Sequence, residues 1–268
     1  MYEAHFGMGR RPFSETVLDS AYLQLPSHDA VLRRLKYGLI QAQGPAVLFG
    51  PSGTGKTLLT RKLASEIGGP VAHLGFPMMP PVDLLTFIAD ELGGKLGGNA
   101  ERTMLGEYRR LQSILADCSA RGERPLLVLD EAQSVLDPSM FDLLRMLLNL
   151  TTTGTSDLLL VIVGTADLLL QLPENLADRL SARCLLGPLS ESETASYVSS
   201  RLAVAGSTES LFTDEAVLEL HRSAAGLPRR LNRLADLALL ITYAEDSRQC
   251  DARVISIAAR ELGYDQAA

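Results

Sequence analysis

The sequence has no tryptophan, only three cysteines and four histidines, and no apolar run long enough to cross a bilayer. Cys118, Cys184 and Cys250 lie far apart and are odd in number, which excludes a disulfide scaffold and predicts buried free thiols. No histidine or cysteine pair has metal-ligand spacing, so neither a zinc site nor a histidine-based triad is predicted. The apolar runs, such as residues 158–163, fall short of the ~18 to 20 residues that a membrane helix needs. Residues 1–11 do not form the pattern of a signal peptide, and we expect a cytoplasmic protein without a membrane span.

A basic excess is absent as well. The 268 residues include 25 lysines and arginines against 32 aspartates and glutamates, a net charge of −7, and the sequence pI is near 5.2. This balance weighs against a protein that binds nucleic acid over its whole surface, although a local basic face stays open. The 46% hydrophobic content is that of a globular chain, long enough for a large core or for a core with a small second unit.

Short apolar segments alternate with helical patterns through the first 188 residues. The segments expected to form buried strands are 46–49, 71–74, 126–129, 158–163 and 184–186. Apolar residues at helical spacing and stop signals predict helices at 29–41, 56–67, 82–92, 103–121 and 137–150. This alternation predicts an α/β fold in which helices cover both faces of a parallel sheet.

Strand patterns stop after Pro188. Ser190, with Glu193 three residues later, forms an expected capping box, and helical patterns follow at 191–204, 214–225, 228–244 and 251–262. We therefore expect two domains: an α/β core at residues 1–189, including an N-terminal extension at 1–45, and an all-helical lid at 190–268.

A glycine-rich turn between the first expected strand and the next helix carries the clearest chemistry. Residues 50–57 match the phosphate-binding loop G-x-x-x-x-G-K-[ST] in the required context of strand and helix. Glycines in such a loop let backbone N–H groups face phosphates, Lys56 neutralises their charge, and Thr57 offers its hydroxyl to Mg²⁺. The alternative is a glycine-rich turn with an accidental Lys-Thr pair. The expected nucleotide-binding residues are Gly50, Pro51, Ser52, Gly53, Thr54, Gly55, Lys56, Thr57 and Leu58.

Two carboxylates, Asp130 and Glu131, directly follow the apolar segment 126–129. Ligands of open α/β sheets bind at the carboxyl ends of the strands, so this is a Walker B arrangement. Asp130 is expected to hold the Mg²⁺ shell, and Glu131 to orient and deprotonate the attacking water. On its own the pair also fits a solvated strand end or a helix cap, but after the phosphate-binding loop it indicates hydrolysis of a nucleoside triphosphate.

Hydrolysis also needs positive charge at the terminal phosphate beyond one lysine. Arg179 and Arg183, just before the last expected strand, are candidates to reach the nucleotide of a neighbouring subunit, and the sequence does not choose between them. Arg229 begins a helix of the expected lid, and Thr165 follows segment 158–163 as a candidate sensor of water or γ-phosphate. The alternatives are surface arginines whose aliphatic stems pack on the fold, and a threonine that forms a turn.

With these residues the sequence resembles the AAA+ ATPases, and within them the ExeA/GspA-like secretion ATPases. The resemblance covers nearly the whole chain and rests on residues 1–7, 12–13, 28, 35–39, 129–133, 163–164 and 226–232. It implies a P-loop NTPase with a five-stranded core, a helical lid, ATP bound between them, and assembly into a ring or filament. By position, Thr165 falls at sensor 1, Arg179 or Arg183 at the arginine finger, and Arg229 at sensor 2.

The chain departs from the family pattern at Pro51 and Thr165, where the family commonly has glutamate and glutamine. The membrane span and cell-wall-binding region of secretion members are also absent from the sequence, which weakens the expectation of a direct role in secretion. Related modules serve as ATP-dependent regulators of transposition and as replication-initiator-like proteins.

We expect an ATP-hydrolysing molecular switch that couples its nucleotide state to self-assembly and to remodelling of a partner. The alternative is an ATP-dependent DNA-binding assembly protein. Residues 191–268 count 8 lysines and arginines against 12 aspartates and glutamates, a balance of −4 that disfavours DNA binding by the lid. The basic clusters at 33–36 and 109–110 are candidates to line a ring's pore or are solvated helix faces. A small-molecule kinase ranks last, because residues 93–102 include only Lys95 and Arg102 as basic groups.

Overall fold

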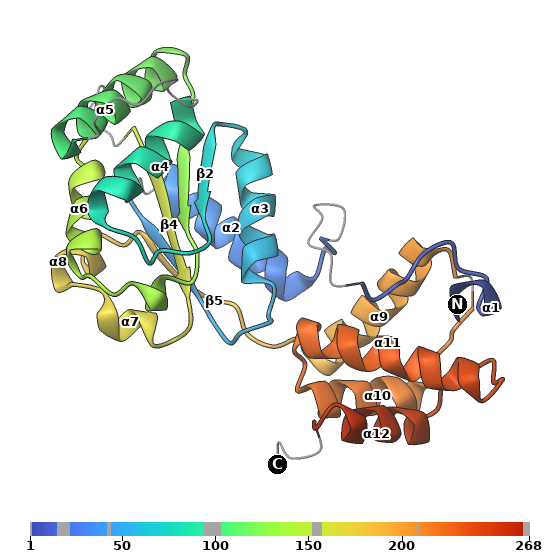
Figure 1. Ribbon diagram of the computed structural model, residues 1–268. Coiled ribbons are helices and arrows are strands. Elements are labelled where there is room, and N and C mark those ends of the chain that lie inside the picture. The colour runs from blue at the N-terminus through green and yellow to red at the C-terminus, as the bar shows by residue number, and fades with distance from the viewer. Residues whose placement is uncertain are drawn as a thin grey trace. The chain divides into compact units, whose positions relative to one another are not determined.

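A computed structural model describes residues 2–14, 22–41, 44–93, 103–151, 157–207 and 209–264. The chain forms two compact units (Figure 1). The first, which we call the helical unit, comprises Met1–Asp29, Ser52–Gly55 and Gly187–Ala268, and the second, the α/β unit, comprises Ala30–Pro51 and Lys56–Leu186.

The α/β unit is built on a five-stranded sheet, as the sequence and the family resemblance predict. Its strands are β1 (Ala46–Phe49), β2 (Val71–Leu74), β3 (Leu126–Leu129), β4 (Leu159–Gly164) and β5 (Ala182–Leu185), in the spatial order β2-β3-β4-β1-β5. Every pair is parallel. β5 begins two residues earlier than expected, because Ala182 pairs with Ala46 of β1, a contact that local hydrophobicity does not reveal.

Helices cover both faces of this sheet. Figure 1 shows α4 and α6 on one face and α2 and α3 on the other. Side chains of the strands alternate between the two faces, so Leu127, Leu129, Leu160 and Ile162 join the core cluster with α4, α5 and α6. The helical elements are α2 (Pro26–Ile40), α3 (Lys56–Ile67), α4 (Pro81–Gly93), α5 (Met104–Ala120), the 3₁₀ turn η2 (Ala132–Ser134), α6 (Ser139–Leu147), α7 (Leu168–Gln171) and α8 (Glu174–Ala177).

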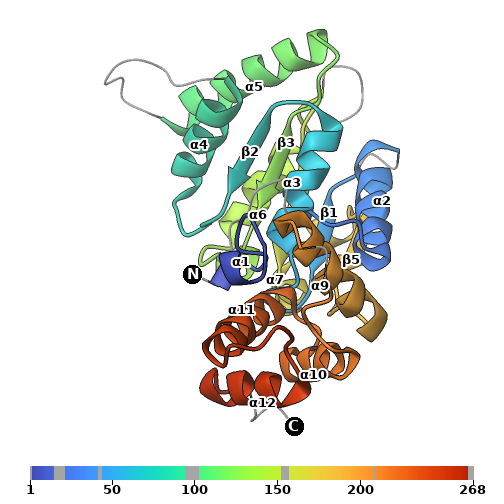
Figure 2. The same ribbon diagram turned by 90° about the vertical axis from the view of Figure 1, so that its right-hand side faces the viewer.

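The helical unit contains α1 (Tyr2–His5), α9 (Glu191–Ala205), α10 (Asp214–Ala224), α11 (Pro228–Ala244) and α12 (Ala252–Glu261). In Figure 2, α10 and α11 both lie against α12. The predicted capping box starts α9: the Ser190 hydroxyl accepts the Glu193 N–H, and the Glu193 carboxylate accepts the Ser190 N–H. Within the described residues, every helix falls short of the length and hydrophobicity that a bilayer crossing requires.

Residues 1–29 are grouped with the helical unit and residues 30–45 with the α/β unit, whereas the expected division placed all of residues 1–45 with the α/β core. Tyr2, Phe6 and Phe13 are buried in the core of the helical unit. The Tyr2 hydroxyl and the Arg11 guanidinium both donate to the carboxylate of Asp236 in α11. The hydrogen bonds join residues more than 200 positions apart, so no local sequence pattern encodes them.

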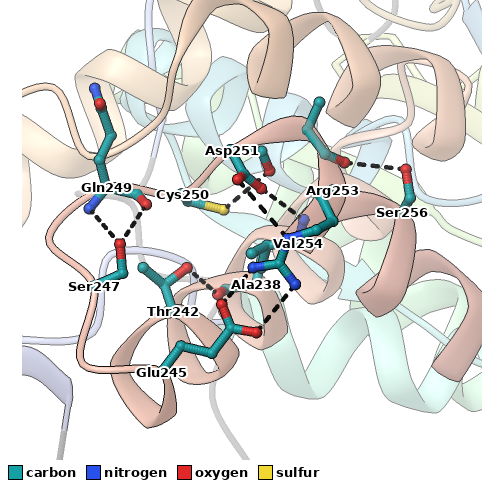
Figure 3. A network of polar contacts seen from close by, with 11 residues as sticks. Ala238, Thr242, Glu245, Ser247, Gln249, Cys250, Asp251, Arg253, Val254 and Ser256 are labelled. Atoms are coloured by element: carbon teal, nitrogen blue, oxygen red, sulfur yellow. Dashed lines mark hydrogen bonds and ion pairs between the residues drawn. The ribbon is translucent and has the colours of Figure 1, made fainter.

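A polar network closes the turn between α11 and α12 (Figure 3). Arg253 donates two hydrogen bonds to Glu245, at 2.6 and 3.2 Å, and the Asp251 carboxylate accepts the N–H of Val254 at the start of α12. Cys250 lies in the same turn, where burial raises the pKa of its thiol to about 11. All three cysteines are buried free thiols, as predicted.

Candidate active site

The residue after β1 and the first residue of α3 fix the two ends of the glycine-rich loop. The Gly50 N–H donates to the carbonyl of Gly164 at the end of β4, at 3.2 Å. Lys56 is buried and its Nζ donates to the carbonyls of Gly50 and Pro51, at 2.9 and 3.0 Å. The loop thus folds back around the ammonium group, while Thr57 and Leu58 continue the first turn of α3.

The tip of this loop, Ser52–Gly55, is grouped with the helical unit. Gly53 and Gly55 have φ of +85° and +97°, which L side chains rarely adopt. Arg229, in the first turn of α11, donates its backbone N–H to the Gly53 carbonyl at 3.2 Å and its Nη1 to the Ser52 hydroxyl at 3.3 Å. The predicted sensor arginine therefore contacts the predicted phosphate-binding loop.

His28, which was not among the predicted site residues, also contacts this tip. Nε2 of His28 lies 3.1 Å from the Thr54 carbonyl, and its Nδ1 lies 3.2 Å from the Ser27 hydroxyl. Burial lowers the pKa of His28, and the Thr54 carbonyl and the carboxylates of Glu193 and Asp29 partly oppose that shift. A neutral imidazole that donates from Nε2 fits the carbonyl. The only signal for His28 in the sequence is its place in the family resemblance.

Two hard oxygen ligands meet between α3 and β3. The Thr57 hydroxyl donates to Oδ2 of Asp130 at 2.6 Å, and Oδ1 of Asp130 accepts the N–H of Glu131 at 2.9 Å. Nε2 of His73 lies 3.5 Å from Oδ2. Burial raises the pKa of Asp130, but the hydrogen bonds from His73, Thr57 and Glu131 outweigh it and leave the pKa below its usual value.

This pair fits a magnesium ion. Mg²⁺ prefers carboxylate and hydroxyl oxygens, and at nucleotide sites it takes one or two protein ligands together with phosphate oxygens and water. Thr57 and Asp130 provide such a pair, and their side chains already touch. Within the described ranges there is no group of three histidine, cysteine or acidic side chains that would form a cage for a different metal.

Glu131 adopts an unusual backbone conformation, with φ of 51° and ψ of 38°. Its carboxylate accepts a hydrogen bond of 2.6 Å from Nε2 of Gln133, and Oε1 of Gln133 accepts the N–H of Thr165 at 3.1 Å. Thr165 directly follows β4, beside the strand end that carries Asp130. The structure thus brings Glu131 and Thr165 together through Gln133, which was not among the predicted site residues.

Arg179 and Arg183 lie away from the residues that surround Lys56 and Asp130. Arg179 donates to the Asn149 side chain at 2.8 Å, and Arg183 donates to the Ala177 carbonyl at 3.0 Å. Arg183 pairs with Val47 within the sheet, and Arg179 lies before the start of β5, whereas the phosphate-binding loop follows the carboxyl end of β1. Both arginines are exposed. Within one chain neither is placed beside Lys56 or Asp130.

The sequence matches a known family model and a curated protein. A model described as an AAA domain matches residues 40–172. General secretion pathway protein A of Aeromonas hydrophila is 35% identical over an alignment of 268 residues, which covers 98% of this chain and 48% of that protein. The chain therefore spans about half the length of this relative.

Solved structures share the fold. Cdc6p of Pyrobaculum aerophilum aligns over 93% of this chain and 70% of its own, with a TM-score of 0.73 and 19% identity. The Aeropyrum pernix ORC1 protein, solved in complex with DNA, aligns over 95% and 70%, with a TM-score of 0.69 and 21% identity. The Holliday junction branch migration motor RuvB of Thermotoga maritima aligns over 94% and 74%, with a TM-score of 0.60 and 18% identity. At these identities the likeness shows the fold alone.

Proposed function

The chain belongs to the AAA+ ATPases, and we propose that it binds ATP with Mg²⁺ and hydrolyses the bond between the β- and γ-phosphates. The observation that carries the proposal is the contact between Thr57 and Asp130, beside a loop that folds around Lys56. A serine or threonine after the P-loop lysine and an aspartate at the end of a neighbouring strand hold Mg²⁺ in P-loop NTPases.

Each group has a distinct task in phosphate binding. Backbone N–H groups of residues 50–57 and the amino end of α3 receive the phosphates. Lys56 exchanges its two carbonyl partners for the β- and γ-phosphate oxygens. Thr57 and Asp130 would hold Mg²⁺, which would supply positive charge to the phosphates when bound.

Glu131 is the proposed general base. Its carboxylate accepts a proton from a water molecule, whose oxygen forms the new bond to the γ-phosphorus while the bond to the bridging oxygen breaks. The products are ADP and inorganic phosphate. Gln133 already holds this carboxylate, and Thr165 at the end of β4 is the proposed sensor of the γ-phosphate.

We further propose that ATP turnover drives a switch in self-assembly. Arg179 and Arg183 are exposed, and neither lies at the carboxyl end of β1 where the phosphate-binding loop begins, so they fit a role on the nucleotide of a second copy. The relationship to General secretion pathway protein A supports a secretion-ATPase-like context with a protein partner that the switch remodels. Arg229, which contacts Ser52 and Gly53, fits the role of sensor 2.

Substitution Glu131→Gln tests the proposed chemistry. It removes the base but keeps the shape of the side chain, so ATP binding in calorimetry is expected to stay within about twofold while turnover falls by roughly a hundredfold or more. Glu174→Gln, on an exposed position of α8, is the matched control and should leave both quantities unchanged. Wild-type turnover by the Glu131 variant would reject Glu131 as base, and absence of ATP binding by the wild-type chain would reject the function.

The same assay separates the DNA-binding alternative. Turnover is measured with and without duplex DNA at several salt concentrations. For a secretion-ATPase-like switch, we expect equal turnover with and without DNA. Salt-dependent stimulation by DNA would instead favour an ATP-dependent DNA-binding assembly protein.

A further inference from the structure

One amide side chain joins two parts of the proposed site. Nε2 of Gln133 donates to the Glu131 carboxylate at 2.6 Å, and Oε1 accepts the Thr165 N–H at 3.1 Å. The orientation of the amide follows from its partners, because only the oxygen can accept from a backbone N–H and only the nitrogen can donate to a carboxylate. Both hydrogen bonds lie within the α/β unit.

The space for this amide depends on a glycine. A Cβ at Gly164 would lie 2.5 Å from Oε1 of Gln133, closer than real Cβ atoms approach another atom. The carbonyl of Gly164 also accepts the N–H of Gly50, the first residue of the phosphate-binding loop. The main chain that anchors Gln133 is therefore continuous with the main chain that anchors this loop.

The backbone of Glu131 supports the same arrangement. Its left-handed conformation is rare for a residue with a side chain and persists only where neighbouring contacts over-determine it. The turn η2 places Gln133 two residues later, with its amide against the Glu131 carboxylate. A glutamate side chain has three rotatable bonds, so a second contact is needed to hold its carboxylate at one position.

We propose that Gln133 is a positioning residue for hydrolysis: it holds the Glu131 carboxylate and ties it to the main chain of Thr165 at the end of β4. This inference rests on the proposed ATPase function. Gln133 touches neither the nucleotide nor the water in this role, and it acts through Glu131. Its loss should therefore slow the chemical step and leave nucleotide binding intact.

Two substitutions separate the two hydrogen bonds. Gln133→Met keeps the length of the side chain and removes both bonds. Gln133→Glu keeps an oxygen that accepts from Thr165 but places a carboxylate against Glu131. Since a hydrogen bond to a charged group is lost in each, kcat should fall roughly tenfold or more in both variants, with KM and the dissociation constant of ADP within about twofold of wild type. Gln171→Ala, an exposed glutamine at the end of α7, is the control and should match wild type.

A double-mutant cycle tests whether Gln133 acts through Glu131. In a Glu131→Gln background, Gln133→Met is expected to cause no further loss of the residual rate, because the carboxylate that it positions is already gone. Gly164→Ala should displace the amide and lower kcat in the wild-type background, and it should lower kcat less after Gln133→Met. Because a Cβ at Gly164 also meets Leu168, the melting temperature of each variant is measured alongside.

The outcomes distinguish this inference from the proposed function. Wild-type kcat in both Gln133 variants, or an equal loss with and without Glu131, would overturn the positioning role while the ATPase function stands. A parallel fall in nucleotide affinity and melting temperature would also overturn it, because that pattern marks a purely structural residue. If Glu131→Gln itself hydrolyses ATP like wild type, Glu131 is not the base and the positioning role of Gln133 fails with it. If the wild-type chain neither binds nor hydrolyses ATP, the proposed function itself fails.

Discussion

Gly50 gives the sharpest test of how the sheet supports the site. A Cβ built on Gly50 lies 2.1 Å from the carbonyl oxygen of Leu186, whereas carbon–oxygen contacts between adjacent strands are about 3.3 Å or longer. Gly50→Ala therefore requires a shift of about 1.2 Å between two stretches of main chain. No side chain can rotate away to relieve it. The N–H of Leu186 donates to the Phe49 carbonyl at 2.8 Å, so the shift also breaks the hydrogen bond that joins β1 to the end of β5.

The expected cost combines these two effects. Overpacking a rigid site costs about 1–3 kcal/mol and a lost backbone hydrogen bond about 1 kcal/mol, so we expect Gly50→Ala to lower the free energy of unfolding by about 3 kcal/mol. For a chain of this size, that loss corresponds to a fall of roughly 6–12 °C in the melting temperature. ATP binding should weaken as well, because the Gly50 carbonyl and N–H position Lys56 and the loop.

Gly75→Ala is the matched control for this experiment. Gly75 follows β2 as Gly50 follows β1, but a Cβ added to Gly75 would meet no atom within 4 Å, and the φ of this residue is not in the left-handed range. Its substitution should change the free energy of unfolding by no more than about 0.5 kcal/mol. Thermal unfolding followed by circular dichroism compares the variants. If the melting temperature of Gly50→Ala equals those of Gly75→Ala and wild type, the close approach of Gly50 to Leu186 is not a constraint on the fold.

Three further predictions address the loop tip and assembly. Arg229→Ala should weaken ATP binding roughly tenfold in calorimetry, because it removes the hydrogen bond from the guanidinium to the Ser52 hydroxyl. Arg230→Ala, whose guanidinium lies over the ring of Tyr264, should not weaken binding, and equal effects of the two substitutions would exclude a specific role of Arg229. Because burial lowers the pKa of His28 below 6.5, the unfolded chain binds more protons just below that pH, so the melting temperature should fall as pH drops from 7 towards 5.5. His28→Gln should flatten this slope, and an unchanged slope would assign it to other groups. Turnover per chain should rise with protein concentration, and alanine substitution of the arginine finger, either Arg179 or Arg183, should abolish that rise. A turnover per chain that stays constant on dilution would exclude both arginines as a finger that acts on a second copy.

Local chemistry made much of the site predictable. The glycines, lysine and threonine of residues 50–57 act within one strand-loop-helix unit, and Asp130 follows directly on its own strand. Their roles depend on neighbours in the sequence and on the shared edge where parallel strands end. Gln133 and His28 escaped prediction because each acts on a group that another element supplies: the Thr165 N–H after β4, and the Thr54 carbonyl in the loop tip.

The sequence by itself determined the α/β character, the positions of the five strands to within about two residues, the phosphate-binding loop and the all-helical C-terminal region. The spacing of apolar residues and the positions of turn-forming residues encode these features over short stretches of sequence. Only the tertiary structure decided the strand order β2-β3-β4-β1-β5, the packing of the N-terminal segment on the helical unit, and the amide link between Glu131 and Thr165. Those features are contacts between residues distant in sequence, whose free energy depends on shape and register that no local pattern records.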